Sequence, residues 1–185
     1  VCWSSFGQDG DGDGIFGQIY NNDGTNRGEE FQINTSINNF QNNPAVSGLS
    51  DGGFVVSWHS QNQDGGHKGI YGQLFESDGT NRGEEFQINT YTNDDQAYPS
   101  VYGLTGGGFV CCWTSLEQDG SSHGVYGQMY DNLGKKRGSE FQINTYTYNS
   151  QFGSNICGQK KRWICGLLVK FWTRWEPERY LCPIV

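Results

Sequence analysis

The chain repeats itself with a period of 55 residues, and this repetition limits its possible folds more than any other feature. The segment 52–75 (GGFVVSWHSQNQDGGHKGIYGQLF) recurs as 107–130, and its second half recurs earlier as 1–20. A fixed period of this size indicates an array in which one supersecondary unit is stacked on copies of itself. The repeated positions include Trp3, Trp58 and Trp113, and also Gln18, Gln73 and Gln128.

Each unit is predicted to contain four short β-strands. In the middle unit, the apolar runs 44–49 and 54–60 are separated by a Ser-Asp-Gly-Gly turn. The runs 70–75 and 85–89 then alternate apolar and polar residues on either side of an Asp-Gly turn. Alternation with a period of two excludes a helical repeat, and tight turns join consecutive strands into an antiparallel meander. Four such strands per repeat are typical of a propeller blade, so we expect an all-β partial β-propeller of about three blades.

The predicted array covers residues 1–159. It is divided into a partial unit (1–43), two complete units (44–98 and 99–153) and the start of another unit (154–159). The pattern begins and ends inside a unit, and the first residue is not Met. We therefore expect a fragment of a longer array, whose remaining blades are its first partners.

Composition narrows the class of partner. The chain has a formal net charge of −8 and a pI near 4.7, which argues against nucleic acid and against anionic membranes. No stretch approaches the roughly 18 apolar residues of a membrane span. The 28 glycines among many Asn and Asp residues suit short strands joined by turns.

A candidate calcium site lies near the start of the chain. Asp9, Asp11 and Asp13 place three carboxylates at alternate positions of a Gly-rich loop, and a hard cation takes oxygen ligands of this kind. The equivalent loops of the next two units keep only Asp64 and Asp119. The alternative interpretation is an ordinary turn rich in Asp and Gly.

The other repeated or reactive side chains have structural and functional interpretations. We expect the three tryptophans to pack between blades, with a sugar-stacking platform as the alternative. The three glutamines are expected to bond backbone groups inside the meander. The histidines occupy different positions of the unit, which disfavours a shared metal site or a catalytic base. Cys2 and Cys112 share the position of Ser57, and the cysteines are expected to be small strand residues and not a disulfide framework. These residues are His59, His67, His123, Cys2, Cys111, Cys112 and Cys157, and the redox state of the cysteines stays open.

Residues 51–90 (DGGFVVSWHSQNQDGGHKGIYGQLFESDGTNRGEEFQINT) and 106–145 resemble repeats of large secreted or surface proteins of the haemolysin-type calcium-binding and cadherin-like kind. The resemblance extends from residue 1 to about residue 158. It implies a propeller-like, non-catalytic module that is extracellular or exposed on the cell surface. The nonapeptide pattern GGxGxDxUx of calcium-binding repeats does not occur in this sequence.

The sequence therefore predicts a non-catalytic binding or adhesion module, stabilised by calcium if the aspartate loop binds it. Its ligand is expected to be a carbohydrate or a protein at a surface. Two alternatives remain. In the first, the chain is part of a propeller glycosidase or lyase, and in the second, it is a purely structural spacer. Catalysis needs a unique set of acid, base and orienting groups, and the three units differ mainly in loop residues that offer none.

The tail from residue 160 onward departs from the repeat. It holds six of the 12 Lys and Arg residues but only two of the 20 acidic ones. Residues 159–184 can be back-translated so that deletion of one A from the A run gives QKKGGFVVFWSSFGQDGNLRGIYAQL, which is the next repeat. The restored Trp lies at position 168, which is 113 + 55. We therefore interpret 160–185 as a frameshifted tail, and residues 1–159 alone carry 6 basic and 18 acidic side chains, a net charge of 6 − 18 = −12.

This hypothesis predicts the DNA sequence across codons 155–185. Resequencing is expected to find one A fewer in the run near codons 159–162, after which the reading frame continues into further 55-residue units. An A run that stands as written would contradict the frameshift and would make the basic, Trp-rich tail a genuine segment of the protein.

Overall fold

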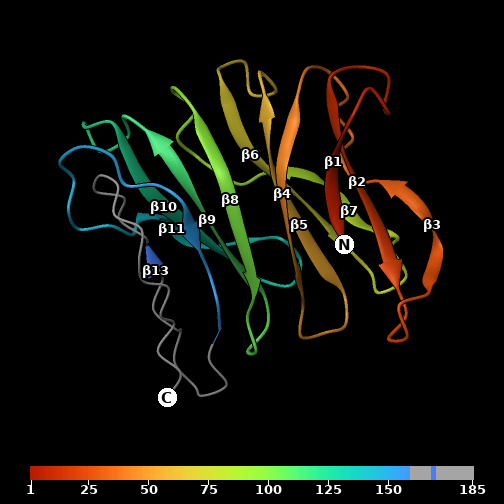
Figure 1. Ribbon diagram of the computed structural model, residues 1–185. Helices are drawn as coiled ribbons and strands as arrows, with labels where there is room; N and C mark the ends of the chain where they lie inside the picture. Colours follow the sequence, from red (N-terminus) through yellow and green to blue (C-terminus); the bar gives the residue numbers. More distant parts are fainter. Residues whose placement is uncertain (159–167, 170–185) are drawn as a thin grey trace, which may run out of the picture.

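The computed structural model describes residues 1–158 and 168–169 (Figure 1). The predicted frameshifted tail, apart from residues 168–169, lies outside this part. The regular structure of the described residues is entirely β, and no helix among them could span a membrane. In chain order the strands are β1 (Cys2–Phe6), β2 (Asp13–Tyr20), β3 (Asn26–Gln32), β4 (Gln41–Gly48), β5 (Phe54–Gln61), β6 (Lys68–Phe75), β7 (Asn81–Gln87), β8 (Gln96–Gly103), β9 (Phe109–Leu116), β10 (His123–Tyr130), β11 (Lys136–Gln142), β12 (Ser154–Asn155) and β13 (Leu168–Val169).

The strands repeat with the period of the sequence. Strands β4 to β7 begin and end 55 residues before β8 to β11, and β2 and β3 begin and end 55 residues before β6 and β7. The all-β prediction is therefore confirmed, with shifted boundaries. The first strand of the unit begins at Gln41 and not at Pro44, and the fourth begins at Asn81 and not at Glu85. Both strands contain or oppose a β-bulge, and a bulge interrupts the simple alternation from which a boundary is predicted.

Each complete unit forms one antiparallel sheet. The strand orders are β4-β5-β6-β7 and β8-β9-β10-β11, so neighbours in sequence are neighbours in space. The first sheet, β1-β2-β3, corresponds to the second, third and fourth strands of a unit. Strand β12 corresponds in sequence to β4 and β8 and pairs with β13.

Successive sheets lie against each other, and the first strands of the two complete units, β4 and β8, are adjacent (Figure 1). The backbone N–H of Gly103 in β8 donates to the hydroxyl of Ser47 in β4, at 2.9 Å. The strands approach so closely here that a Cβ on Gly103 would collide with the carbonyl oxygen of Gly48. A residue without a side chain is therefore required where the two first strands meet.

Apolar packing between sheets forms the core. Trp113 of β9 is fully buried in one cluster with Ile70 and Ile88 of the preceding unit. Trp58 occupies the equivalent position one unit earlier and is packed with Ile15. Loss of a large aromatic side chain from such a site costs about 3–5 kcal/mol, so each tryptophan contributes strongly to holding two units together.

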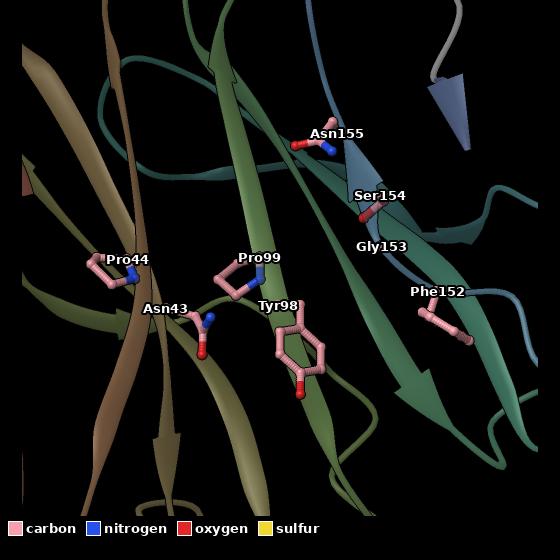
Figure 2. Close-up of a pocket in the computed structure, with 8 residues that line it drawn as sticks. All are labelled: Asn43, Pro44, Tyr98, Pro99, Phe152, Gly153, Ser154 and Asn155. Carbon is pink, nitrogen blue, oxygen red and sulfur yellow. The ribbon is translucent and has the colours of Figure 1, made fainter. Parts of the chain in front are cut away.

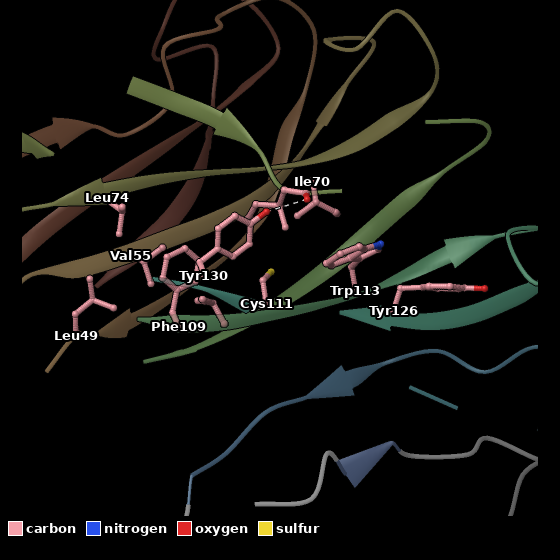
Figure 3. Close-up of a cluster of buried hydrophobic side chains, with 11 residues drawn as sticks. Leu49, Val55, Ile70, Leu74, Phe109, Cys111, Trp113, Tyr126 and Tyr130 are labelled. Atoms are coloured by element: carbon pink, nitrogen blue, oxygen red, sulfur yellow. Dashed lines mark hydrogen bonds between the residues drawn. The ribbon is translucent and has the colours of Figure 1, made fainter. Parts of the chain in front are cut away.

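Two aromatic rings of the third sheet extend this contact (Figure 3). Phe109 and Tyr130 stack on each other with their ring centroids 4.8 Å apart. The hydroxyl of Tyr130 donates to the carbonyl oxygen of Ile88 in the preceding unit, at 2.9 Å. Burial raises the pKa of Tyr130 well above its usual value, so the phenol stays a hydrogen-bond donor over the whole physiological pH range.

The repeated glutamines complete a bulge between the third and fourth strands. Pairing of β6 with β7 shifts register between Gly72 and Leu74, on either side of Gln73. The buried Gln73 amide donates to the carbonyl oxygens of Leu74 and Gly83, at 2.8 and 3.1 Å. Gln18 and Gln128 make the equivalent bonds in their units. The side chain thus bonds carbonyl groups at the point where the register of the ladder shifts.

A buried pair of amides connects the last strand of each unit to the first strand of the next. The Asn89 side chain accepts from the N–H of Ile70 at 2.7 Å and donates to the Tyr91 carbonyl and to the Gln96 side chain. Gln96 in turn donates to the carbonyl oxygen of Asn93, at 2.7 Å. The pairs Asn34 with Gln41 and Asn144 with Gln151 repeat this arrangement, and all six side chains are buried.

Replacement of Asn89 by Ala is expected to lower the free energy of unfolding by about 1–3 kcal/mol, because it leaves the buried N–H of Ile70 and the Gln96 oxygen without partners. Urea unfolding of the full chain measures this loss. The matched control is Asn93→Ala, since Asn93 is exposed and contributes a backbone carbonyl that the substitution keeps. Equal losses in the two variants would contradict the role of the amide pair.

Candidate functional site

The predicted calcium-loop aspartates bond to protein groups. Asp9 accepts from the backbone N–H of Asp11 and from the Asn34 amide, both at 3.4 Å. Its counterparts Asp64 and Asp119 bond in the same manner, to a backbone N–H two residues on and to a glutamine amide of their own unit. The first aspartate of the loop is therefore a turn residue in all three units.

The other two aspartates connect the loop to the start of the next unit. Asp11 accepts from the N–H of Asn39 and Asp13 from the amide of Asn42, each at 3.0 Å. No group of three or more His, Cys, Asp or Glu side chains in the described residues could hold a metal ion. The three carboxylates bond to separate protein groups, and calcium binding by this loop stays a prediction.

Two of the three repeated tryptophans lie at the contacts between sheets. Trp58 and Trp113 are fully buried, which excludes the sugar-stacking alternative for these two side chains. Trp3, in the first sheet, is half-buried. Only exposed aromatic rings elsewhere in the chain can therefore stack on a carbohydrate.

An open groove of about 440 Å³ crosses the first strands of three successive units (Figure 2). This volume is within the range of small-molecule sites. Figure 2 shows Asn43, Tyr98 and Phe152 in a row across these strands. The described residues of its lining are Asn43, Pro44, Tyr98, Pro99, Phe152, Gly153, Ser154 and Asn155.

A repeated β-bulge shapes this groove. In β8, Ala97 pairs with Thr114 and Ser100 pairs with Cys112, so that Tyr98 and Pro99 together lie opposite Trp113. Strand β4 carries the same bulge opposite Trp58. A bulge turns its extra residue away from the ladder, and proline fits there because the position needs no N–H donor.

The bulges of β4 and β8 hold their first residue in the left-handed region, and the equivalent residue before β12, Gly153, has the same conformation. Asn43 has φ 56°, Tyr98 has φ 57° and Gly153 has φ 77°. Asn and Gly adopt this conformation readily, whereas a bulky residue does so at a cost of about 1–2 kcal/mol. Tyr98 is also 55% exposed, so little burial offsets this cost. Strain of this kind is typical of positions with a function.

Two histidines contact the aromatic rings of the groove. His59 lies edge-to-face against Tyr98, with ring centroids 6.0 Å apart, and His123 lies in the same manner against Phe152 at 6.3 Å. The sequence did not predict this similarity, because the two histidines occupy different positions in their units. The contacts orient both rings while leaving Phe152 42% exposed.

The charge state of His59 follows from its surroundings. Burial, with a smaller contribution from the Lys68 ammonium, lowers the pKa of His59 to about 4, although the Asp95 carboxylate acts in the opposite direction. Lys68 and Asp95 form an ion pair at 3.2 Å, and His67 lies 4.0 Å from the same carboxylate. His59 is therefore a neutral ring at physiological pH.

Cysteine is a small buried residue in the third unit. Burial raises the pKa of Cys112 to about 11, and its thiol lies 3.2 Å from the hydroxyl of Ser154. Burial also raises the pKa of Cys111. Cys2, Cys111 and Cys112 form no disulfide within the described residues, and the redox compartment of the protein stays open.

A carboxylate that the sequence did not predict connects neighbouring units. Glu85 accepts from the backbone N–H and the hydroxyl of Thr35 in the preceding unit, at 2.6 and 2.9 Å. Glu140 makes the same two bonds to Thr90. The signal was present as the repeated pair of a Glu and a Thr that lie 50 residues apart. It could not be recognised without the contact between sheets.

Compared with known proteins, the chain matches no family model, no curated sequence and no solved structure. The resemblance to secreted and surface repeat proteins stays a prediction.

The neutral His59 predicts a pH dependence of stability. Its pKa is about 4 in the folded chain and about 6.5 in the unfolded one. The unfolded chain therefore binds more protons between these values, and the free energy of unfolding falls by up to about 3 kcal/mol as the pH falls from 7 to 4. The equivalent residue of the next unit is Thr114, so His59→Thr removes the titrating ring and introduces a residue that the repeat already has at this position.

Unfolding measured at intervals from pH 4 to 7 is expected to give a smaller slope for His59→Thr than for the unsubstituted chain. The other titrating groups are common to both proteins, so the difference isolates His59. Parallel pH profiles would show that this ring is not held in its neutral form by the fold.

Proposed function

We propose that the chain is a non-catalytic binding or adhesion module of a secreted or cell-surface protein, and that its ligand binds in the groove formed by the first strands. The observation that carries this proposal comes from comparing equivalent residues of the units. Residues that hold the units together are constant, and residues that line the groove vary. The buried amides, tryptophans and bulge glutamines are the same in every described unit. The positions that line the groove are mostly different.

Equivalent groove positions hold side chains of different size and chemistry. The bulge residue is Asn43 in β4 and Tyr98 in β8, and the equivalent residue of the following repeat is Gly153. The position before it is Ala97 in one unit and Phe152 in the following one. Repeat proteins typically keep the contacts between units constant and bind ligands on an extended concave surface. The differences at the groove are those expected of such a surface.

We further propose that the units are consecutive blades of a β-propeller. Four-stranded antiparallel meanders, a constant period and adjacent first strands support this arrangement. In a propeller the first strands surround the central axis, so the groove would open toward that axis.

The lining of the groove favours binding over catalysis. Tyr98 is the one titratable side chain among its described residues, whereas hydrolysis of a glycosidic bond typically needs two carboxyl groups on either side of that bond. The strongly shifted tyrosine pKa values belong to the buried Tyr71, Tyr126 and Tyr130, which lie in the packing between sheets. Calcium is retained as a prediction only, and a titration of the melting temperature against millimolar calcium tests it.

The full chain immobilised on beads is expected to bind saturably to a glycan array or to an intact cell layer, and to leave chromogenic glycosides of the same sugars intact. Saturable binding without turnover supports the proposal. Hydrolysis of a glycoside by an activity that copurifies with the chain would overturn the non-catalytic assignment. Absence of binding to every surface would favour the structural spacer.

A further inference from the structure

We propose that the groove centred on Tyr98 binds a neutral, extended carbohydrate, with Tyr98 and Phe152 as the two stacking platforms. This inference rests on the proposed binding function and names the ligand class of the same site. The groove combines three features, which are exposed aromatic rings, amide groups without a hydrogen-bond partner among the described residues, and a described lining without charge.

The aromatic rings provide two separate contact surfaces. Tyr98 and Phe152 are 55% and 42% exposed, and each is fixed by one histidine at its edge. They belong to the first-strand segments of neighbouring units, so a ligand that touches both must cross from one strand to the next. An oligosaccharide presents an apolar ring face at regular intervals along its length, which suits two platforms of this kind.

The polar groups of the groove suit hydroxyl groups. Asn43 and Asn155 are exposed, and within the described part of the chain their side chains make no hydrogen bond. A primary amide offers both donors and an acceptor, and a sugar hydroxyl can satisfy either. The amides lie on opposite sides of the Tyr98 strand, so they can bond to the same ligand from two directions (Figure 2).

Charge decides against the other ligand classes. The eight described lining residues are all uncharged, and residues 1–159 carry 18 acidic and 6 basic side chains. An anionic glycan or a phosphorylated ligand would meet no cation among the described lining residues, and the chain as a whole is acidic. A proline-rich peptide also docks on aromatic grooves and is the competing outcome of the test.

The strained backbone at Tyr98 gives the proposal a diagnostic sign. A residue retained only for folding should be the one that stabilises the fold, but Asn and Gly, found at this position in the neighbouring units, fit φ 57° better than Tyr does. Replacement of Tyr98 by Asn should therefore remove the ligand contact and leave the melting temperature unchanged or higher.

Affinity electrophoresis of the full chain measures the binding directly. Native gels contain one neutral polysaccharide each (amylose, xyloglucan, galactomannan or xylan), and parallel gels contain the anionic alginate. Retardation by at least one neutral polysaccharide is expected, with an association constant that falls about tenfold or more in Tyr98→Asn and in Phe152→Ala. The Phe152 variant carries the residue that the preceding unit has, as Ala97.

The matched control is Tyr148→Asn. Tyr148 is 68% exposed, lies outside the groove and is Asn at the equivalent positions 38 and 93. Its substitution is expected to leave retardation unchanged. The melting temperature of Tyr98→Asn is expected to equal that of the unsubstituted chain or to exceed it by up to about 2–4 °C.

Three results would overturn this inference. They are no retardation by any neutral polysaccharide, tighter binding of alginate or of a decaproline peptide than of any neutral polysaccharide, and full retention of neutral-sugar binding by Tyr98→Asn. A clear drop in the melting temperature of Tyr98→Asn would make Tyr98 a structural residue and would also count against it. If the immobilised chain binds a glycan array or a cell layer while these gels show no retardation, the binding function stands and only the ligand class is wrong.

Discussion

The structure depends on burial of the face of one sheet against the next. A sheet of four short strands cannot exclude water from both of its faces by itself. Trp113 and Tyr130 illustrate the solution, since both extend from one sheet and contact Ile88 or its neighbours in the preceding sheet. Folding of one unit is therefore favourable only beside another unit. This dependence explains the constant period of the sequence, because every unit must present the same surface to the unit that follows.

Polar groups at the joints between units are as constant as the apolar ones. The pair Asn89 and Gln96 satisfies the backbone where the chain passes from one sheet into the next, and Glu85 reaches back to Thr35 in the opposite direction. Buried donors and acceptors that lose their partners are costly, so these positions have little freedom to change. The bulge of the first strand is different, because its extra residue faces the groove. Here the units carry Asn, Tyr and Gly without disturbing the fold.

The sequence predicts the strands and turns well, whereas it gives few signals of the groove. Alternation around the Asp-Gly turn identifies the third and fourth strands, and the constant spacing of Trp58 and Trp113 identifies contacts between units. Tyr98 could not be identified in this manner, because a tyrosine in a strand gives no sign that its φ is positive. Asp9 shows the opposite difficulty. Three alternate aspartates look the same in a calcium loop and in a turn, so their spacing alone does not distinguish the two. The structure adds the hydrogen bonds of Asp9 to the N–H of Asp11 and to the Asn34 amide.

The carboxylate of Glu85 has a mechanical consequence for a chain under tension. It bonds to Thr35, which lies 50 residues earlier, so this contact spans the junction of two sheets, while the other carboxylate oxygen accepts from the Gln63 amide of its own unit. A force that separates neighbouring units must break this carboxylate contact and the apolar face together, after which each unit can unravel by itself. About 55 residues of extended chain, or roughly 190 Å, are then released at each step. An array built in this manner yields in equal increments and dissipates a sudden load in stages.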